Sequence, residues 1–201
     1  MKKLAILPAF LVLLAGASSC EKNQVEPTQP TISAADATLD ALTQGKTVTS
    51  TNTGTYPYTY QVVENGITVT KNATGTFTSA LRITSFEVRN GVITAIGTLS
   101  ATPTSGPASA YGPVAVAIPL SLAQISSSCS GAQVNYGTQT VSLNGTTQSV
   151  NPVLSVSPSQ SDKNLLGNLV CSLGKILGNP SPSDTGGVVS HLNKIISIIG
   201  S

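Results

Sequence analysis

The sequence predicts a mainly β domain, an antiparallel sandwich or partly open barrel of about seven to nine strands, closed by a C-terminal helical hairpin. Three observations lead to this expectation. Apolar and polar residues alternate from about residue 56 onward. Asn-Gly pairs at 65–66, 90–91 and 144–145 are flanked by β-forming residues, a pattern that favours tight hairpins. After Pro158 the apolar residues recur at helical spacing instead.

The N-terminus has the pattern of an export signal. Lys2 and Lys3 precede an apolar run over residues 4–15, and small residues at 16–19 lead into Cys20. Such a run is too short for a membrane-spanning helix, which needs roughly 20 residues, and it suits the core of a signal peptide. We therefore predict a signal peptide over residues 1–19.

The stretch "LLAGASSCEKNQVEP" resembles the lipobox of bacterial lipoproteins, in which a cysteine is acylated and becomes the first residue of the mature chain. Ala17 departs from the usual Leu or Val of that motif. The resemblance implies a lipoprotein with palmitate-type acylation at Cys20, anchored in the membrane. Glu21, rather than Asp, follows, which implies an outer-membrane lipoprotein facing the periplasm or the cell exterior. The alternative is an ordinary signal peptide that leaves Cys20 as a thiol.

The next segment, residues 20–32, is polar and carries Pro27 and Pro30, so we expect a flexible tether. Residues 33–201 then form a single β-rich domain. Its first segment, "SAADATLDALTQG", offers a short helix that begins after Ser33 and stops at Gly45.

The Asn-Gly pairs set the expected strand registers. A two-residue turn at 90–91 pairs Arg89 with Val92 and Phe86 with Ala95. The predicted core face of this hairpin holds five residues: Phe86, Val88, Ile93, Ala95 and Leu99. The hairpin at 65–66 places another apolar set on one face: Tyr58, Tyr60, Val62, Ile67 and Val69.

The remaining β segments are less uniform. The near-continuous apolar run "VAVAIPLSLAQI" contains Pro119, which indicates a bulge or an edge strand. The third hairpin, "QTVSLNGTTQSV", pairs Val141 with Gln148 and is polar enough to lie at an edge or to form a partly exposed pair of strands.

The helical hairpin is expected at about residues 162–200. Its first helix begins at Ser161 or Asp162, stops at Gly178, and carries an apolar stripe of Leu166, Leu169, Val170, Leu173, Ile176 and Leu177. Its second helix repeats the design with Val188, Leu192, Ile195, Ile196 and Ile199.

Composition excludes several classes of function. Only 9% of residues are charged, and the ten basic residues less Lys2 and Lys3 leave eight against eight acidic ones. The sequence shows no basic face of the kind that would indicate nucleic-acid binding.

Three cysteines in an exported chain leave one unpaired. If Cys20 is acylated, Cys129 and Cys171 remain to form a disulfide, the alternative being two buried free thiols.

The order "GTFTSALRITSFEVRNGVITAIGTLSAT", Cys129, a β ribbon and "NLLGNLVCSLGKIL" resembles a family of small secreted bacterial proteins of unknown function. These share a hairpin of related pattern, a later cysteine and an NLLGNLLC-type helix. The resemblance covers roughly residues 75–200 and implies a common fold with a Cys129–Cys171 bond. It implies no activity. The segment "YGTQTVSLNGTTQSV" is more polar than the corresponding Leu-rich segment of that family.

No catalytic, cofactor-binding or metal-binding constellation emerges. His191 is the one histidine, and it is expected to face solvent or a helix interface. Glu64 and Glu87 adjoin hairpin turns, and Asp184 is expected to cap a helix. We expect no enzymatic activity and no cofactor. The predicted function is a lipid-anchored envelope module with a structural or binding role. The alternative is a carrier whose C-terminal helices cover a cavity for a small hydrophobic ligand, and a hydrolase is the least favoured hypothesis.

Overall fold

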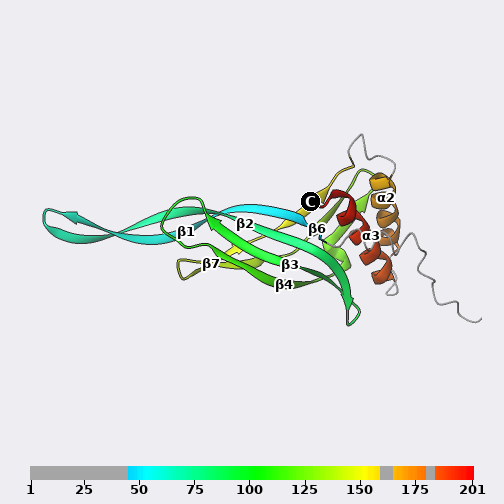
Figure 1. Cartoon of the computed structure of the whole chain (residues 1–201), viewed down its shortest axis with the longest axis horizontal. Helices are drawn as coiled ribbons and strands as arrows, with labels where there is room; N and C mark the ends of the chain where they lie inside the picture. Colours follow the sequence, from blue (N-terminus) through cyan, green and yellow to red (C-terminus); the bar gives the residue numbers. More distant parts are fainter. Residues whose placement is uncertain (1–44, 159–164, 180–183) are drawn as a thin grey trace, which may run out of the picture. The chain divides into compact units, whose positions relative to one another are not determined.

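The computed structural model describes residues 45–158, 165–179 and 184–201, which all belong to one structural unit (Figure 1). The elements in chain order are β1 (Val48–Glu64), β2 (Ile67–Arg89), β3 (Val92–Pro103), β4 (Tyr111–Leu120), a 3-10 turn η1 (Leu122–Gln124), β5 (Ile125–Ser128), β6 (Gly131–Asn135), β7 (Gln139–Leu143), β8 (Thr146–Val150), β9 (Val153–Val156), α2 (Leu165–Gly178) and α3 (Thr185–Ile199). The expected signal peptide, tether, first short helix and helix caps Ser161 and Asp162 lie outside the described residues.

The strands form three antiparallel sheets, which confirms the mainly β fold. The largest has the order β1-β2-β3-β4, the second β5-β6-β9 and the third β7-β8. None of these sheets closes on itself within the described ranges, so the architecture is a partly open sandwich. Each predicted Asn-Gly pair forms a hairpin turn, and Asn65, Asn90 and Asn144 all have a positive φ, as tight hairpin turns require.

The predicted registers are confirmed. Arg89 pairs with Val92 and Phe86 with Ala95 in the β2–β3 hairpin, and Val141 pairs with Gln148 between β7 and β8. The residues predicted to form the core face of the β2–β3 hairpin are all buried, with one exception.

That exception is Val88, which is 43% exposed, whereas Phe86 and Ile93 are buried. Ile93 lies directly opposite Val88 and is flanked by β2 and β4, whereas Val88 lies beyond the start of β1, on an open edge of the sheet. The prediction for Val88 was therefore wrong because sheet periodicity defines a face but does not define which part of that face is covered.

The apolar run around Pro119 ends earlier than the sequence suggested. β4 stops at Leu120 and lies at the edge of its sheet, where Pro119 costs no ladder bond within the sheet. The chain then makes the 3-10 turn η1, and Ile125 opens the next sheet.

One hydrophobic core joins the three sheets and the helices. Its largest fully buried side chains include Tyr56, Phe77, Phe86 and Tyr136. The two-stranded β7–β8 sheet contributes Val141, Leu143 and Val150, so its apolar side is buried although its sequence is polar overall.

The predicted helical hairpin is present, and it packs against the sheets (Figure 1). Leu166, Val170 and Leu173 of α2 are buried, and α3 buries a stripe of Val188, Leu192, Ile195 and Ile196. Ile199, expected on that stripe, is partly exposed near the chain end. No helix in the described part of the chain has both the length and the hydropathy to cross a membrane.

Helix α3 also supplies hydrogen-bond partners to the part of β2 that extends beyond the start of β1. The β1–β2 ladder starts at the Val48–Ile83 pair, and a register shift follows at residues 83–85. Beyond it, the Asn193 side chain takes the place of a strand: its Oδ1 accepts a hydrogen bond from Phe86 N at 2.8 Å, and its Nδ2 donates to Phe86 O at 2.9 Å. A helix side chain thereby satisfies both backbone polar groups of a buried residue.

The opposite end of the β1–β2 hairpin has no third strand. The last β2–β3 pair joins Phe77 to Pro103, so beyond it residues 55–64 of β1 and 67–76 of β2 form a two-stranded ribbon. We call this segment the ribbon (Figure 1). Tyr58, Tyr60, Val62, Ile67 and Val69 do share one face, as predicted, and Tyr60 and Ile67 are 43% and 67% exposed.

Candidate functional site

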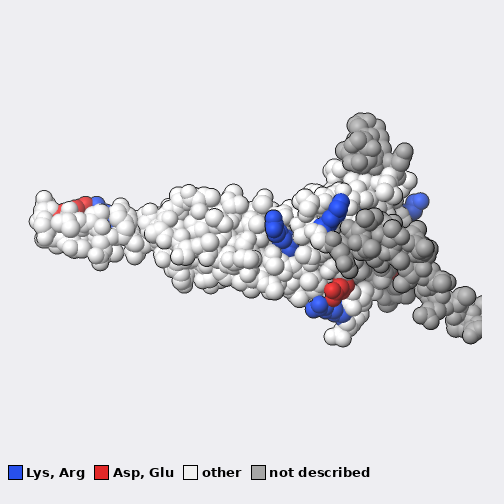
Figure 2. All heavy atoms as spheres, in the orientation of Figure 1, with Lys and Arg blue, Asp and Glu red and all other residues white. Residues whose placement is uncertain are grey.

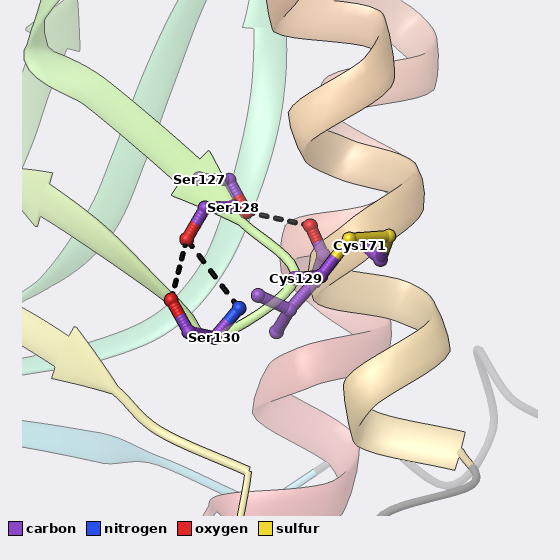
Figure 3. The surroundings of a disulfide bond; sticks show 6 residues. Ser127, Ser128, Cys129, Ser130 and Cys171 are labelled. Atoms are coloured by element: carbon purple, nitrogen blue, oxygen red, sulfur yellow. Dashed lines mark hydrogen bonds between the residues drawn. A yellow bond between two sulfur atoms is a disulfide. The ribbon is translucent and has the colours of Figure 1, made fainter.

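The disulfide joins Cys129, in the turn after β5, to Cys171 in α2 (Figure 3). This confirms the predicted bond and fixes the helical hairpin to the three-stranded sheet. Next to it, Ser127 Oγ donates a hydrogen bond to the backbone oxygen of Val170 at 2.6 Å. Gly174 allows the close approach, because a Cβ built there would lie 2.8 Å from Ser127 O.

A shallow hollow of about 350 Å³ lies beside this bond, on the β5-β6-β9 sheet. Its polar lining consists of hydroxyl and amide side chains: Ser126, Ser127, Ser128, Ser130, Gln133, Ser155 and Ser157. Several of them are hydrogen-bonded to one another. Ser128 and Ser130 are joined at 2.8 Å (Figure 3), and Gln133 donates to Ser155 at 3.2 Å. Such a lining can exchange hydrogen bonds with a neutral polar molecule and offers no ionic contact.

His191 lies half-buried between the two helices. Its Nδ1 is 2.8 Å from Gly187 O, and its Nε2 is 3.0 Å from Ser172 Oγ. Because a carbonyl oxygen only accepts, Nδ1 carries a proton and donates to Gly187 O, while Nε2 is hydrogen-bonded to the serine hydroxyl. This resembles the serine–histidine half of a hydrolase triad, but a carbonyl stands where the triad has a carboxylate. The arrangement ties α2 to α3.

The structure does not bring the candidate acids to His191. Glu64 closes β1 at the tip of the ribbon, where it forms an ion pair with Lys71. Glu87 lies near the other end of β2 and pairs with Arg89 at 2.9 Å. Both acids are about half exposed. Asp184 occupies the N-cap position of α3 without a side-chain capping hydrogen bond.

A second hollow, of about 360 Å³, is apolar. It is lined by Val92, Ile93, Pro119, Leu120 and Leu122 together with Gly91, Ser121 and Thr185. It lies where the start of β3 and the end of β4 meet the start of α3. The carrier hypothesis expected a cavity between the sheet and the helices, and there Leu173, Val188 and Leu192 pack as part of the core.

Two buried tyrosines show features that the sequence did not reveal. Tyr56 is fully buried, its hydroxyl donates to Ser105 O at 2.7 Å, and Ala108 N donates to that hydroxyl at 3.2 Å. Tyr136 is also buried, and its hydroxyl has no hydrogen-bond partner among the described residues. Burial raises the pKa of the Tyr136 phenol. No local sequence signal distinguishes the two, because the partners of Tyr56 come from a distant segment.

Charged side chains are sparse on the face seen in Figure 2. Within the described ranges, no group of three His, Cys, Asp or Glu side chains is arranged to hold a metal ion. Cys20, the predicted acylation site, lies outside the described residues.

The chain matches no protein-family model, and comparisons with curated proteins and with solved structures give no match. The resemblance to small secreted proteins of unknown function therefore stays a prediction.

Proposed function

We propose that the protein is an exported module of the bacterial cell envelope, anchored by an acyl group on Cys20, with a structural or binding role and no enzymatic activity. The cysteine pairing carries this proposal. Since Cys129 and Cys171 are bonded to each other, Cys20 is the one cysteine left for another chemistry. A disulfide also suits an oxidising compartment outside the cytoplasm.

The anchor would be strong. Each buried methylene of an acyl chain contributes about 0.8 kcal/mol to membrane binding, and stable anchoring takes more than one chain. The tether at residues 20–32 would separate the folded domain from the membrane surface. The anchor would lie in the outer membrane, and the domain would face the periplasm or the cell exterior.

Metabolic labelling with a clickable fatty acid in the native host tests the anchor. The wild-type protein should be labelled, Cys20→Ser should lose the label, and the double variant Cys129→Ser/Cys171→Ser should keep it. The double variant is the matched control, because it removes the other two cysteines and leaves the lipobox-like sequence intact. Label retained by Cys20→Ser, or missing from the wild type, would contradict the proposal.

A second candidate function is a carrier of a small hydrophobic molecule, and the apolar hollow at Val92 and Leu122 favours it. Native mass spectrometry of protein purified from its host would show a bound apolar molecule. Val92→Arg would place a charge in that hollow and should remove the ligand, whereas Val63→Arg at the ribbon should not. Protein that emerges empty under non-denaturing conditions would count against the carrier.

A further inference from the structure

The ribbon leaves one edge of β2 without a strand partner. Residues 67–74 pair with β1 on one side only, because β3 ends at the pair Phe77–Pro103. A two-stranded ribbon is marginally stable in water, and an unpaired edge is a template for another strand. What this edge can bind depends on the backbone groups that it presents.

Hydrogen bonds at Thr76 identify those groups. Thr76 O accepts from Thr104 N at 2.8 Å, and Thr76 N donates to Ser105 Oγ at 2.9 Å, so both polar groups of Thr76 point to the β3 side. Every second residue of an antiparallel strand points its backbone groups the same way. The β1–β2 register runs unbroken to the turn. The residues that direct both N–H and C=O to the open edge are therefore Thr68, Thr70, Asn72 and Thr74.

The outer edge of β1 is different. Thr55 pairs with Thr76, and since Thr76 points away from β1, this is a non-hydrogen-bonded pair whose β1 member points outward. By the same alternation Pro57 stands at an outward position, where its missing N–H interrupts the edge. Proline at an edge is a recognised protection against further pairing. Of the two ribbon edges, that of β2 has no proline, and its one charged side chain, Lys71, is paired with Glu64 of β1.

The side chains favour a copy of the same strand as the partner. Residues 67–74 read "ITVTKNAT", rich in β-forming residues with one charge, and that charge, Lys71, is paired with Glu64. Segments of high β-propensity and low net charge on an open edge pair readily with themselves. Ile67, an apolar side chain at the start of this segment, is 67% exposed and would lose water on association.

We propose that two copies of this chain associate through antiparallel pairing of residues 67–74 of β2, which joins two ribbons into a four-stranded sheet. The proposal goes beyond the anchored module described above and does not depend on acylation.

The backbone directions select a register. With Thr70 opposite Thr70 on the two-fold axis, the two residues exchange both backbone hydrogen bonds, and Thr68 meets Asn72 of the other copy. The apolar face stays continuous, with Val69 beside Lys71. A register centred on Lys71 instead would place two ammonium groups directly opposite each other, which is destabilising. The contact uses the same strand of both copies, so it closes on itself, and Pro57 on the outer edges opposes growth into a fibre.

Sedimentation equilibrium tests this with the predicted mature chain, residues 20–201, carrying Cys20→Ser and exported behind a cleavable signal so that the disulfide forms. The wild-type domain should show a monomer–dimer equilibrium. Thr70→Pro removes the N–H at the axis from both copies, which should weaken dimerisation about tenfold or more. Thr59→Pro is the matched control: the same change on the same ribbon, at an outward position of β1. It should leave the dimer unchanged.

A cross-link separates a lost dimer from a damaged fold. In the Cys20→Ser background, Thr70→Cys should form a disulfide between two copies on mild oxidation, whereas Thr59→Cys should stay monomeric. A wild-type domain that sediments as a monomer at every concentration, or equal cross-linking of the two cysteine variants, would overturn the proposal. Capture of a strand from a different protein by a monomeric domain would overturn it equally.

Discussion

The amide of Asn193 replaces a missing strand, and its removal should be one of the most damaging single changes in the helices. Asn193→Ala leaves the N–H and C=O of Phe86 without partners, at a residue only 2% exposed. Each unpaired buried group costs about 1–3 kcal/mol, so the two together should lower the free energy of unfolding by about 2–6 kcal/mol. That is a large part of the roughly 5–15 kcal/mol that stabilises an ordinary domain.

Urea denaturation followed by circular dichroism measures this loss as a lower midpoint at unchanged slope. Asn168→Ala is the matched control, because Asn168 is exposed on α2 and the substitution is the same change in a helix. The control should stay within about 0.5 kcal/mol of the wild type. If Asn193→Ala costs no more than Asn168→Ala, the bidentate contact contributes nothing and the reasoning is refuted.

Asn193→Asp adds a test by pH. The introduced carboxylate would face Phe86 O, and burial beside a carbonyl raises the pKa of a carboxyl group above its unfolded value near 3.9. A protonated carboxyl can still donate to Phe86 O. The variant should therefore keep most of its stability below about pH 4 and lose it as pH rises through the folded pKa. The wild-type domain should show no such loss attributable to this position, so the difference in midpoint between the two proteins should widen with pH.

Three further predictions concern the disulfide, the helix contact and a buried phenol. Cys129→Ser/Cys171→Ser should lower the free energy of unfolding by about 4 kcal/mol for a bond between residues 42 apart, measured by urea denaturation; a loss below about 1 kcal/mol would contradict a stabilising role. Gly174→Ala should destabilise the protein, because the new Cβ would lie too close to Ser127 O. Gly167→Ala, which makes only ordinary contacts, should be neutral or stabilise by about 0.5–1 kcal/mol. Thermal melts in which Gly174→Ala is the more stable of the two variants would refute the close approach. Tyr136→Phe removes a buried unpaired hydroxyl and should stabilise by about 1 kcal/mol. Because burial raises the folded pKa of this phenol, the wild-type protein loses stability as pH rises above the unfolded pKa near 10, whereas Tyr136→Phe does not. The advantage of Tyr136→Phe should therefore grow in alkaline urea titrations and not stay constant.

Local chemistry was enough to predict the hairpins and the helices. An Asn-Gly pair accepts a positive φ at its asparagine, and the strand period of two then fixes the pairing on both sides of the turn, as between Phe86 and Ala95. The helical spacing after Pro158 likewise identified Leu173 and Leu192 as buried. The Cys129–Cys171 bond followed from the count of cysteines in a chain expected to be exported.

The tertiary structure determined which part of each sheet face is packed against another element. Val88 and Ile67 have the periodicity of core residues, yet both are exposed, because each lies near an end of the long strand β2 where a neighbouring strand is missing. The length of β3 leaves the β2 edge open at Thr70, and the position of α3 lets Asn193 fill the edge at the other end. A sequence encodes these contacts only through segments far apart in the chain. Period and turn chemistry therefore determined the elements of this protein, while packing between distant elements determined which of their edges and faces remain available to bind.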